Sequence, residues 1–533
     1  MTAEFVSLAE EIVDDLLAAS PTRAYWAGDH RYDDRLPDFS DDAVRAELQS
    51  LAGRAEQLAG VDPAGLTAAD DVDRQLLSAE VDRRRFELAT FDERSWNPLV
   101  HNPGDLIFGL LAREVGDPEQ RLEALAARLS GLPTALSTAE QVLGDCPRVH
   151  VETAIGQLEG TTALVRDEVP ALLGRVPGLR KRVEPARDGA LTALARHADF
   201  LHALLPKAQR DPRLGRDLWE ARLQHTLDSA FTAAAVLESA QGDLERVTEA
   251  LTEAAAQLTG SPDIGAALAT LARDHPDDDT IVAKAGHTLG AATEYVRRLD
   301  LVTVLDDPIE IIMMPEYARG VAVAYCDAPG PLETRVVPTF YAISPTPADW
   351  SPERVQSFYR EYNDHMLRNL TVHEAMPGHY LQLAHARRFR GSSRVRAICQ
   401  SGSFIEGWAV YVEELMIEHG FGGLPVRIQQ LKMQLRMIVN AILDQLVHCA
   451  EMSEADAMAL MIQRGYQEEG EAAGKWRRAL LTSAQLSTYY VGYVETSRIA
   501  RSRPDGRSER EWHDEMLSHG SPAPRHLARL VGG

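Results

Sequence analysis

The stretch His373-Glu374-Ala375-Met376-Pro377-Gly378-His379 decides how this chain is interpreted. In the common H-E-x-x-H metal signature the histidines lie four residues apart on one helical face, with the glutamate as general base. Here they lie six apart, which on a regular helix turns the second roughly 120° away from the first. Pro377 lacks an N–H and its ring clashes with the carbonyl of His373, while Gly378 tolerates backbone angles closed to other residues. The segment therefore predicts a distorted helix that returns His379 to the side of His373; the alternative is an ordinary Pro-Gly helix end.

A second motif, Glu406-Gly407-Trp408-Ala409-Val410-Tyr411-Val412-Glu413-Glu414, begins 27 residues after His379. Catalytic zinc takes three protein ligands, and two histidines with one glutamate are an established set. Glu406 and Glu413 are seven residues apart and so share one helical face. We predict Glu406 as the ligand because Gly407 would leave space against the metal helix. Glu413 is the alternative ligand, or a partner that orients a histidine; a solvated acidic face is the simpler interpretation.

These two motifs resemble the bacterial domain-of-unknown-function (number 885) family, which is similar to helical zinc peptidases of the thimet oligopeptidase, angiotensin-converting enzyme and carboxypeptidase Taq type. The resemblance implies zinc on His373, His379 and Glu406, with Glu374 as the base, and it implies no substrate. It covers nearly the whole chain, because four further segments match: Gly28 to Asp38, Glu361-Tyr362-Asn363, Gln485 to Gly492, and His513-Asp514 to Gly520.

Composition and periodicity favour a mainly α-helical protein. The chain has 533 residues, 45% apolar and 25% charged, with sparse aromatic residues. Abundant Ala, Leu, Glu and Arg favour helices. Helical periodicity runs through residues 1–300 without a linker. We therefore expect one domain over residues 1–533, a large helical bowl. Residues 1–300 would form helical walls, and 301–533 a small antiparallel sheet beside a metal-binding helix, with further elements of a cleft.

Three short β-type runs bounded by Pro and Gly predict that sheet. They are Ile309–Met314, Val321–Tyr325 and Val336–Ile343. Pro338 in the last run favours an edge strand, because proline cannot donate to a neighbouring strand. We hypothesise that Thr339–Ile343 binds an extended substrate through its backbone, with Phe340 and Tyr341 in contact with that substrate. A structural hairpin that caps the core is the alternative.

Charge and cysteine usage bear on partners and location. A formal net charge of -25 argues against nucleic acid or an anionic membrane as a partner. The N-terminus lacks the features of a signal peptide, and no apolar stretch is long enough to span a bilayer. The four cysteines form no C-x-x-C pair and indicate free thiols. We expect a cytoplasmic protein, with its oligomeric state open and a homodimer among the options.

Two further roles need residues beyond the metal ligands. The oxyanion formed in amide hydrolysis needs a donor, for which Tyr489 is the candidate, with Tyr490, His513 and His519 as alternatives. An arginine could bind a substrate's terminal carboxylate, and we assign Arg498 to substrate binding, with Arg394 and Arg396 also within reach.

The sequence thus predicts a zinc-dependent hydrolase that cleaves an amide bond in a short peptide or a peptide-like metabolite. The chemistry follows from the ligand set, because such a zinc ion acidifies water and polarises a carbonyl. The native metal stays open. The alternatives are an amidohydrolase acting on a non-peptide compound and a non-catalytic metal-binding or peptide-binding protein, against which an intact Glu374 argues.

Overall fold

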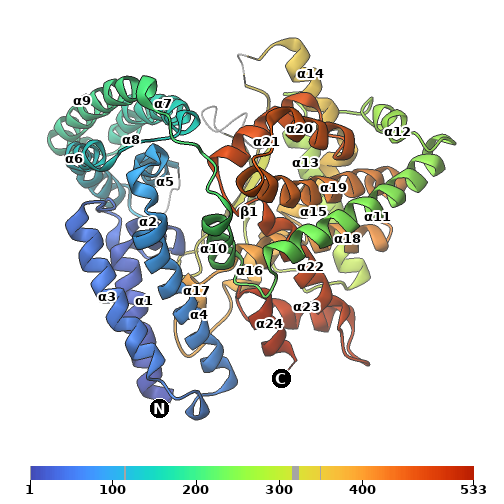
Figure 1. The fold of residues 1–533 in the computed structure, drawn as a ribbon, viewed down its shortest axis with the longest axis horizontal. Coiled ribbons are helices and arrows are strands. Elements are labelled where there is room, and N and C mark those ends of the chain that lie inside the picture. The colour runs from blue at the N-terminus through green and yellow to red at the C-terminus, as the bar shows by residue number, and fades with distance from the viewer. Residues whose placement is uncertain (1, 113–115, 315–322, 348–349, 533) are drawn as a thin grey trace. The chain divides into compact units, whose positions relative to one another are not determined.

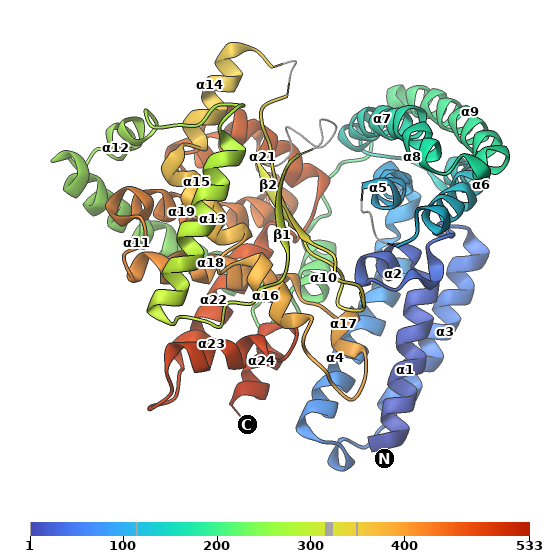
Figure 2. The ribbon, with the colours of Figure 1, turned by 180° about the vertical axis from the view of Figure 1, so that it is seen from behind.

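The computed structural model describes residues 2–112, 116–314, 323–347 and 350–532. It is mainly α-helical with one three-stranded sheet, which confirms the predicted fold class (Figures 1 and 2). Backbone contacts divide the chain into two compact units. The first comprises Met1–Pro212, Pro329–Val337 and Gly391–Ile398, and the second Arg213–Ala328, Pro338–Arg390 and Cys399–Gly533. The expectation of a single domain over residues 1–533 stays a prediction.

The first unit owes its core to leucine-rich helices with apolar residues three and four positions apart. In α6, Leu122, Leu125, Leu129 and Leu132 are all essentially inaccessible to solvent, and α6 packs along α9 (Figure 1). This spacing places them on one helical face. The helices of this unit are α1 (Thr2–Ala19), α2 (Pro21–Ala27), α3 (Asp41–Ala59), α4 (Ala68–Phe86), α5 (Gly104–Ala112), α6 (Pro118–Val142), α7 (Arg148–Ala163), α8 (Val169–Arg175), α9 (Arg180–Leu204) and α17 (Val395–Ile398).

The second unit holds both sequence motifs and has two hydrophobic cores. Its helices are α10 (Arg216–Leu227), α11 (Ala233–Thr259), α12 (Ile264–Leu271), α13 (Ile281–Leu299), α14 (Pro352–Glu361), α15 (Asp364–Glu374), α16 (His379–Ala386), α18 (Gly402–Glu418), α19 (Gly423–Cys449), α20 (Glu454–Ala459), α21 (Glu469–Leu481), α22 (Ser487–Arg501), α23 (Glu509–Leu517) and α24 (Pro524–Val531). One core lies among α10, α11, α19 and α22. The other lies among α13, the sheet, α15 and α18.

The sheet is mixed, so the prediction of an antiparallel sheet is wrong in its pairing. Its strands are β1 (Ile309–Met313), β2 (Ala324–Asp327) and β3 (Thr339–Ile343), in the order β1-β3-β2. β3 pairs parallel with β1 and antiparallel with β2. A parallel neighbour requires a long crossover connection, and the chain between β1 and β3 provides it. Val321 and Ala322, part of the second predicted run, lie outside the described residues.

The prediction that Thr339–Ile343 is an edge strand is also wrong. β3 is the central strand, and both of its edges already pair with strands of the same sheet. Pro338 immediately precedes β3, a position where its missing N–H costs no ladder hydrogen bond. A substrate therefore cannot add to this strand through the backbone, and the hypothesis built on it is withdrawn.

We expect Asp444→Ala to destabilise the second unit by about 3 kcal/mol or more. Asp444 is buried on α19 and accepts four hydrogen bonds of 2.9–3.0 Å from Trp219 Nε1, from the backbone N–H groups of Ala484 and Ser487, and from Ser487 Oγ. Its removal leaves several buried donors without an acceptor. Urea unfolding measures the loss, with Asp505→Ala in an exposed loop as the control; equal stability of the two variants would contradict this role.

Candidate metal centre

The predicted break in the metal helix is present, and it depends on glycine. α15 ends at Glu374 and α16 begins at His379. The Gly378 N–H donates to Val372 O at 3.0 Å, which turns the chain back on itself. A Cβ on Gly378 would lie only 1.8 Å from His373 O and 2.4 Å from Val372 O. No residue with a side chain fits this turn, and the turn brings His379 back toward His373.

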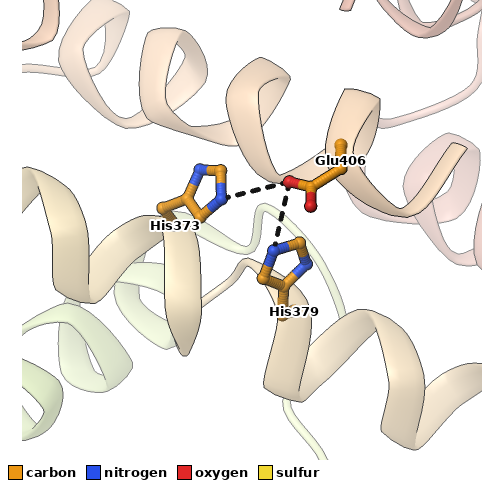
Figure 3. Close-up of side chains that lie close together, drawn as sticks. All are labelled: His373, His379 and Glu406. Atoms are coloured by element: carbon orange, nitrogen blue, oxygen red, sulfur yellow. Dashed lines mark ion pairs between the residues drawn. The ribbon is translucent and has the colours of Figure 1, made fainter. Parts of the chain in front are cut away.

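Three predicted ligands converge at this break (Figure 3). The rings of His373 and His379 lie 4.7 Å apart at 85° to each other. Glu406 Oε2 lies 3.4 Å from His373 Nε2 and 3.5 Å from His379 Nε2. Each of the three residues offers one ligand atom that lies within 4.8 Å of the other two. Among the described residues, no other group of three or more His, Cys, Asp or Glu side chains meets this condition.

This geometry fits a zinc ion. Two ligands about 2.1 Å from a tetrahedral zinc ion lie about 3.4 Å from each other, which matches the two nitrogen–oxygen distances. Glu406 Oε2 is buried and has no hydrogen-bond partner among the described residues, as expected for an atom that binds an ion. His379 Nδ1 is also buried without such a partner, so the second ring nitrogen of His379 lacks the support that ligand histidines usually have.

The electrostatics of the site also favour a cation. Burial by itself lowers the pKa of His373, but the adjacent carboxylates of Glu406 and Glu413 outweigh it and raise that pKa well above its usual value. Burial would likewise raise the pKa of Glu406, yet His379 and His373 hold it well below its usual range. Burial raises the pKa of Glu374, opposed by the two histidines. Three carboxylates around two imidazoles are stable in a buried site only with added positive charge, from protons or from a metal ion.

Glu413 contacts the ring nitrogen of His373 that is not directed at Glu406. Glu413 Oε1 lies 2.7 Å from His373 Nδ1, and its Oε2 accepts a hydrogen bond of 2.5 Å from Asn369 Nδ2. This contact fixes the tautomer in which Nδ1 carries the proton and Nε2 faces Glu406. The sequence predicts Glu406 as the ligand and Glu413 as the alternative ligand or as a partner that orients a histidine; the contact with Nδ1 corresponds to the second of these roles for Glu413.

We expect Glu413→Gln to weaken zinc binding by about 10- to 100-fold, because a neutral amide supports His373 less well. Competition with a fluorescent chelator measures the affinity. Glu414→Gln is the matched control, since Glu414 accepts hydrogen bonds from Tyr493 and Arg501 and none from a ligand. Unchanged affinity in Glu413→Gln would show that His373 needs no such support.

The reason given for preferring Glu406 is corrected by the structure. Gly407 does not face the metal helix α15; it faces α22, where its added Cβ would lie 2.3 Å from Gly492 O. Gly492 faces back, with Ser403 O only 2.1 Å from an added Cβ. These glycines let α18 and α22 approach closely, and this packing fixes the rotation of α18 that presents Glu406.

Two residues that the sequence analysis overlooked hold this centre together. Asn369, which supports Glu413, lies one helical turn before His373, and that spacing is the signal that could have found it. Trp408 Nε1 donates to Pro377 O at 2.9 Å and so ties α18 to the break between α15 and α16. Trp408 is fully buried.

The candidates for oxyanion stabilisation have different surroundings. Tyr489 lies on α22, next to α18, and its hydroxyl accepts a 3.3 Å hydrogen bond from Arg478. Tyr490 points to α11, with its hydroxyl 2.7 Å from Ser239 Oγ and 2.8 Å from Asp243 Oδ2. Tyr490 is therefore a packing residue. Tyr489 is half-buried and stays the candidate.

His513 and His519, the two histidines considered as alternative oxyanion donors, both contact other groups of the protein. His513 is buried, with Nδ1 2.7 Å from Leu301 O and Nε2 2.8 Å from the Tyr411 hydroxyl. Both of its nitrogens are thus in use. His519 Nε2 lies 3.1 Å from Glu515 one turn earlier in the chain.

The residues predicted to bind substrate have different surroundings. Tyr341 is fully buried, with its hydroxyl 3.2 Å from Thr371 Oγ1, and so supports α15. Phe340 is next in β3 and points to the opposite face of the sheet. Arg498 is exposed on α22 with its guanidinium 5.9 Å from the centre of the Phe231 ring. Arg394 and Arg396 belong to the first unit.

Both arginines of the first unit are paired with carboxylates there. Arg394 binds Glu10 and Asp14, and Arg396 binds Asp73, at 2.5–2.9 Å. Their charge is already neutralised within the unit, so we drop them as candidates for a substrate carboxylate.

Comparison with known proteins identifies the family. The fold and site define a helical protein with a candidate two-histidine, one-glutamate metal centre. A family model described as bacterial protein of unknown function (DUF885) matches residues 21–531, and the chain belongs to this family. None of the curated proteins matches the sequence.

Two solved structures are similar along nearly their entire length. One is described as "a putative lipoprotein of unknown function from Shewanella oneidensis"; it is 26% identical, with a TM-score of 0.81, covering 99% of this chain and 100% of its own. The other, "the putative lipoprotein from Colwellia psychrerythraea", is 16% identical, with a TM-score of 0.82 and coverages of 99% and 98%. The second likeness shows the fold alone.

These descriptions contradict the expected cytoplasmic location. Both similar structures are described as a "putative lipoprotein", which for those proteins points to a membrane-anchored or extracellular location and not to the cytoplasm. The expectation rested on the residues of the N-terminus and on unpaired cysteines, neither of which reports the compartment directly. Among the helices of the described ranges, none is long and apolar enough to cross a bilayer.

Proposed function

We propose that this protein is a zinc-dependent hydrolase that cleaves an amide bond in a short peptide or a peptide-like metabolite. The observation that carries the proposal is the convergence of His373, His379 and Glu406, with Glu374 directly beside the first ligand. The resemblance to helical zinc peptidases, drawn from the sequence motifs, belongs to the same proposal. A zinc ion bound there supplies Lewis-acid polarisation of a carbonyl and acidifies water.

The protein's own residues provide the remaining steps. Glu374 accepts a proton from the attacking water on its carboxylate and returns it to the leaving amine nitrogen. Glu374 is buried, and the imidazoles of His373 and His379 and the carboxylates of Glu406 and Glu413 all influence its pKa. Glu413 holds His373 through Nδ1. Tyr489 donates its hydroxyl proton as a hydrogen bond to the developing oxyanion.

We expect Tyr489→Phe to lower kcat by about 10- to 1000-fold with little change in zinc content, because the lost hydroxyl contacts the transition state and not the ion. Steady-state kinetics and elemental analysis measure the two effects. Tyr490→Phe is the control, since its hydroxyl bonds to α11. Unaltered turnover in Tyr489→Phe would remove Tyr489 from the mechanism.

Elemental analysis of the purified protein, followed by a screen against di- and tripeptides with and without chelator, tests the function. We expect about one zinc per chain, and hydrolysis that chelator abolishes and added zinc restores. Zinc without hydrolysis of any peptide would favour a non-peptide amide substrate or a binding protein. Absence of any bound divalent metal would refute the proposal.

A further inference from the structure

A cluster of buried charges lies in the second unit, where α14, α19 and α21 meet. Lys432 Nζ donates to Glu361 Oε2 at 2.8 Å, and both side chains are almost fully buried. Arg436 pairs with Glu471, and the Tyr362 hydroxyl lies between them, 3.1 Å from Arg436 Nη1 and 3.2 Å from Glu471 Oε2. Each of these two carboxylates thus already has a cationic partner.

Two further cations on α21 have no carboxylate of their own. Lys475 lies one turn after Glu471, and only 5% of its surface is exposed. Among the described residues it has no hydrogen-bond or ion-pair partner. Arg478 lies three residues further on the same helical face. Among the described residues its hydrogen-bond partners are both neutral: Gln485 Oε1 at 2.8 Å and the Tyr489 hydroxyl at 3.3 Å, each contacted through Nη2.

This surplus of positive charge is costly in a buried setting. Burial, with added repulsion from Arg436 and Arg478, lowers the pKa of Lys475 well below its usual value, although the carboxylates of Glu471 and Glu361 oppose that shift. An anion beside Lys475 and Arg478 would relieve that repulsion and provide the missing charge. Arg478 makes no hydrogen bond through Nε or Nη1 to a described residue, and it is only half-buried, so its guanidinium retains donors for a ligand.

Arg478 lies beside α22, which packs along α18, the helix that presents Glu406. Arg478 contacts Tyr489 on α22, and the adjacent Thr488 packs against Gly402, where an added Cβ would lie 3.6 Å from Thr488 Cγ2. Gly402 precedes Glu406 by four residues of α18, about 6 Å along the helix. Arg478 therefore lies beside the packed pair of helices, α18 and α22, that presents both Glu406 and the candidate oxyanion donor Tyr489.

We propose that Arg478, with Lys475 behind it, binds the free C-terminal carboxylate of a peptide substrate, which makes the enzyme a carboxypeptidase that releases a short C-terminal fragment. The inference rests on the proposed peptide hydrolysis. A planar guanidinium binds a carboxylate through paired hydrogen bonds, and a bound carboxylate would place a negative charge beside two cations that form no ion pair with a described residue. Arg478 thereby takes the role that the sequence analysis gave to Arg498.

A library of tripeptides, each prepared as the free acid and as the C-terminal amide, tests the proposal. The zinc-loaded full chain carrying Glu374→Gln is mixed with the library, and retained peptides are quantified by ultrafiltration and mass spectrometry. We expect free acids to bind about tenfold or more tightly than the matching amides. Adding Arg478→Gln should bring the ratio to about one, and Lys475→Met should reduce it. Arg477→Gln, an exposed neighbour on α21, should preserve it.

The outcomes separate this inference from the proposed function. Equal retention of acids and amides, an unchanged ratio in Arg478→Gln, or no retention of any peptide overturns the carboxylate site. If acids are retained selectively through Arg478 but no peptide is hydrolysed by the zinc-loaded protein with Glu374 intact, the carboxylate site stands and the hydrolase proposal fails. Hydrolysis of acids and amides at equal kcat/KM leaves a peptidase without this site.

Discussion

Glu374→Gln is expected to retain about one zinc per chain while kcat falls by about 10²- to 10⁴-fold, the range for loss of a positioned general base. The amide of glutamine is nearly the same size as the carboxylate but cannot accept the proton of the attacking water. The ligand atoms belong to His373, His379 and Glu406, so the substitution leaves them unchanged. Zinc by elemental analysis and steady-state kinetics on the same preparation measure both quantities.

Glu418→Gln on the exposed end of α18 is the control, and it should match the parent in both measurements. Two results would contradict the assignment of Glu374. Retained activity would show that another group accepts the proton. Loss of zinc would show that Glu374 holds the metal centre together in place of acting as a base.

The local features of the site could be predicted because they depend on residues close together in sequence. The clash between Pro377 and the carbonyl of His373, and the freedom of Gly378, are properties of seven consecutive residues. They sufficed to predict a break that returns His379 to His373. The choice between Glu406 and Glu413 could not be made in the same way, because both lie on one face of α18. Only the position of α15 decides which one lies beside His373 Nε2 and His379 Nε2 and which one contacts His373 Nδ1.

The predictions that were wrong concern residues whose partners are distant in sequence. Whether Thr339–Ile343 is an edge or a central strand depends on β1, some thirty residues earlier, and no periodicity within the strand reports that pairing. Arg394 was a candidate because it lies within sequence reach of the site motifs, yet Glu10 and Asp14 from the start of the chain neutralise its charge. Arg478 is the opposite case, because no motif in the sequence around it indicates a role. Its charge is unmatched only because the nearby carboxylates of Glu361 and Glu471 pair with other cations, which the structure alone reveals.

The same reasoning predicts the effect of the smallest change at the break. We expect Gly378→Ala to reduce zinc affinity by at least about tenfold and to destabilise the second unit by about 1–3 kcal/mol, the range for overpacking in a well-packed interior. The added methyl group would overlap His373 O, which belongs to the backbone of a ligand and cannot move without moving that ligand. Chelator competition and urea unfolding measure the two effects.

Gly474→Ala on α21 is the matched control, because an added Cβ there meets no atom within 4 Å. Alanine is the better helix former by about 1 kcal/mol, so this variant should be slightly more stable than the parent and bind zinc equally well. The contrast between the two glycines separates local crowding from a general effect of alanine. If Gly378→Ala bound zinc like the parent, the close turn between α15 and α16 would not be what brings the two imidazoles together, and another conformation of this segment would have to account for the site.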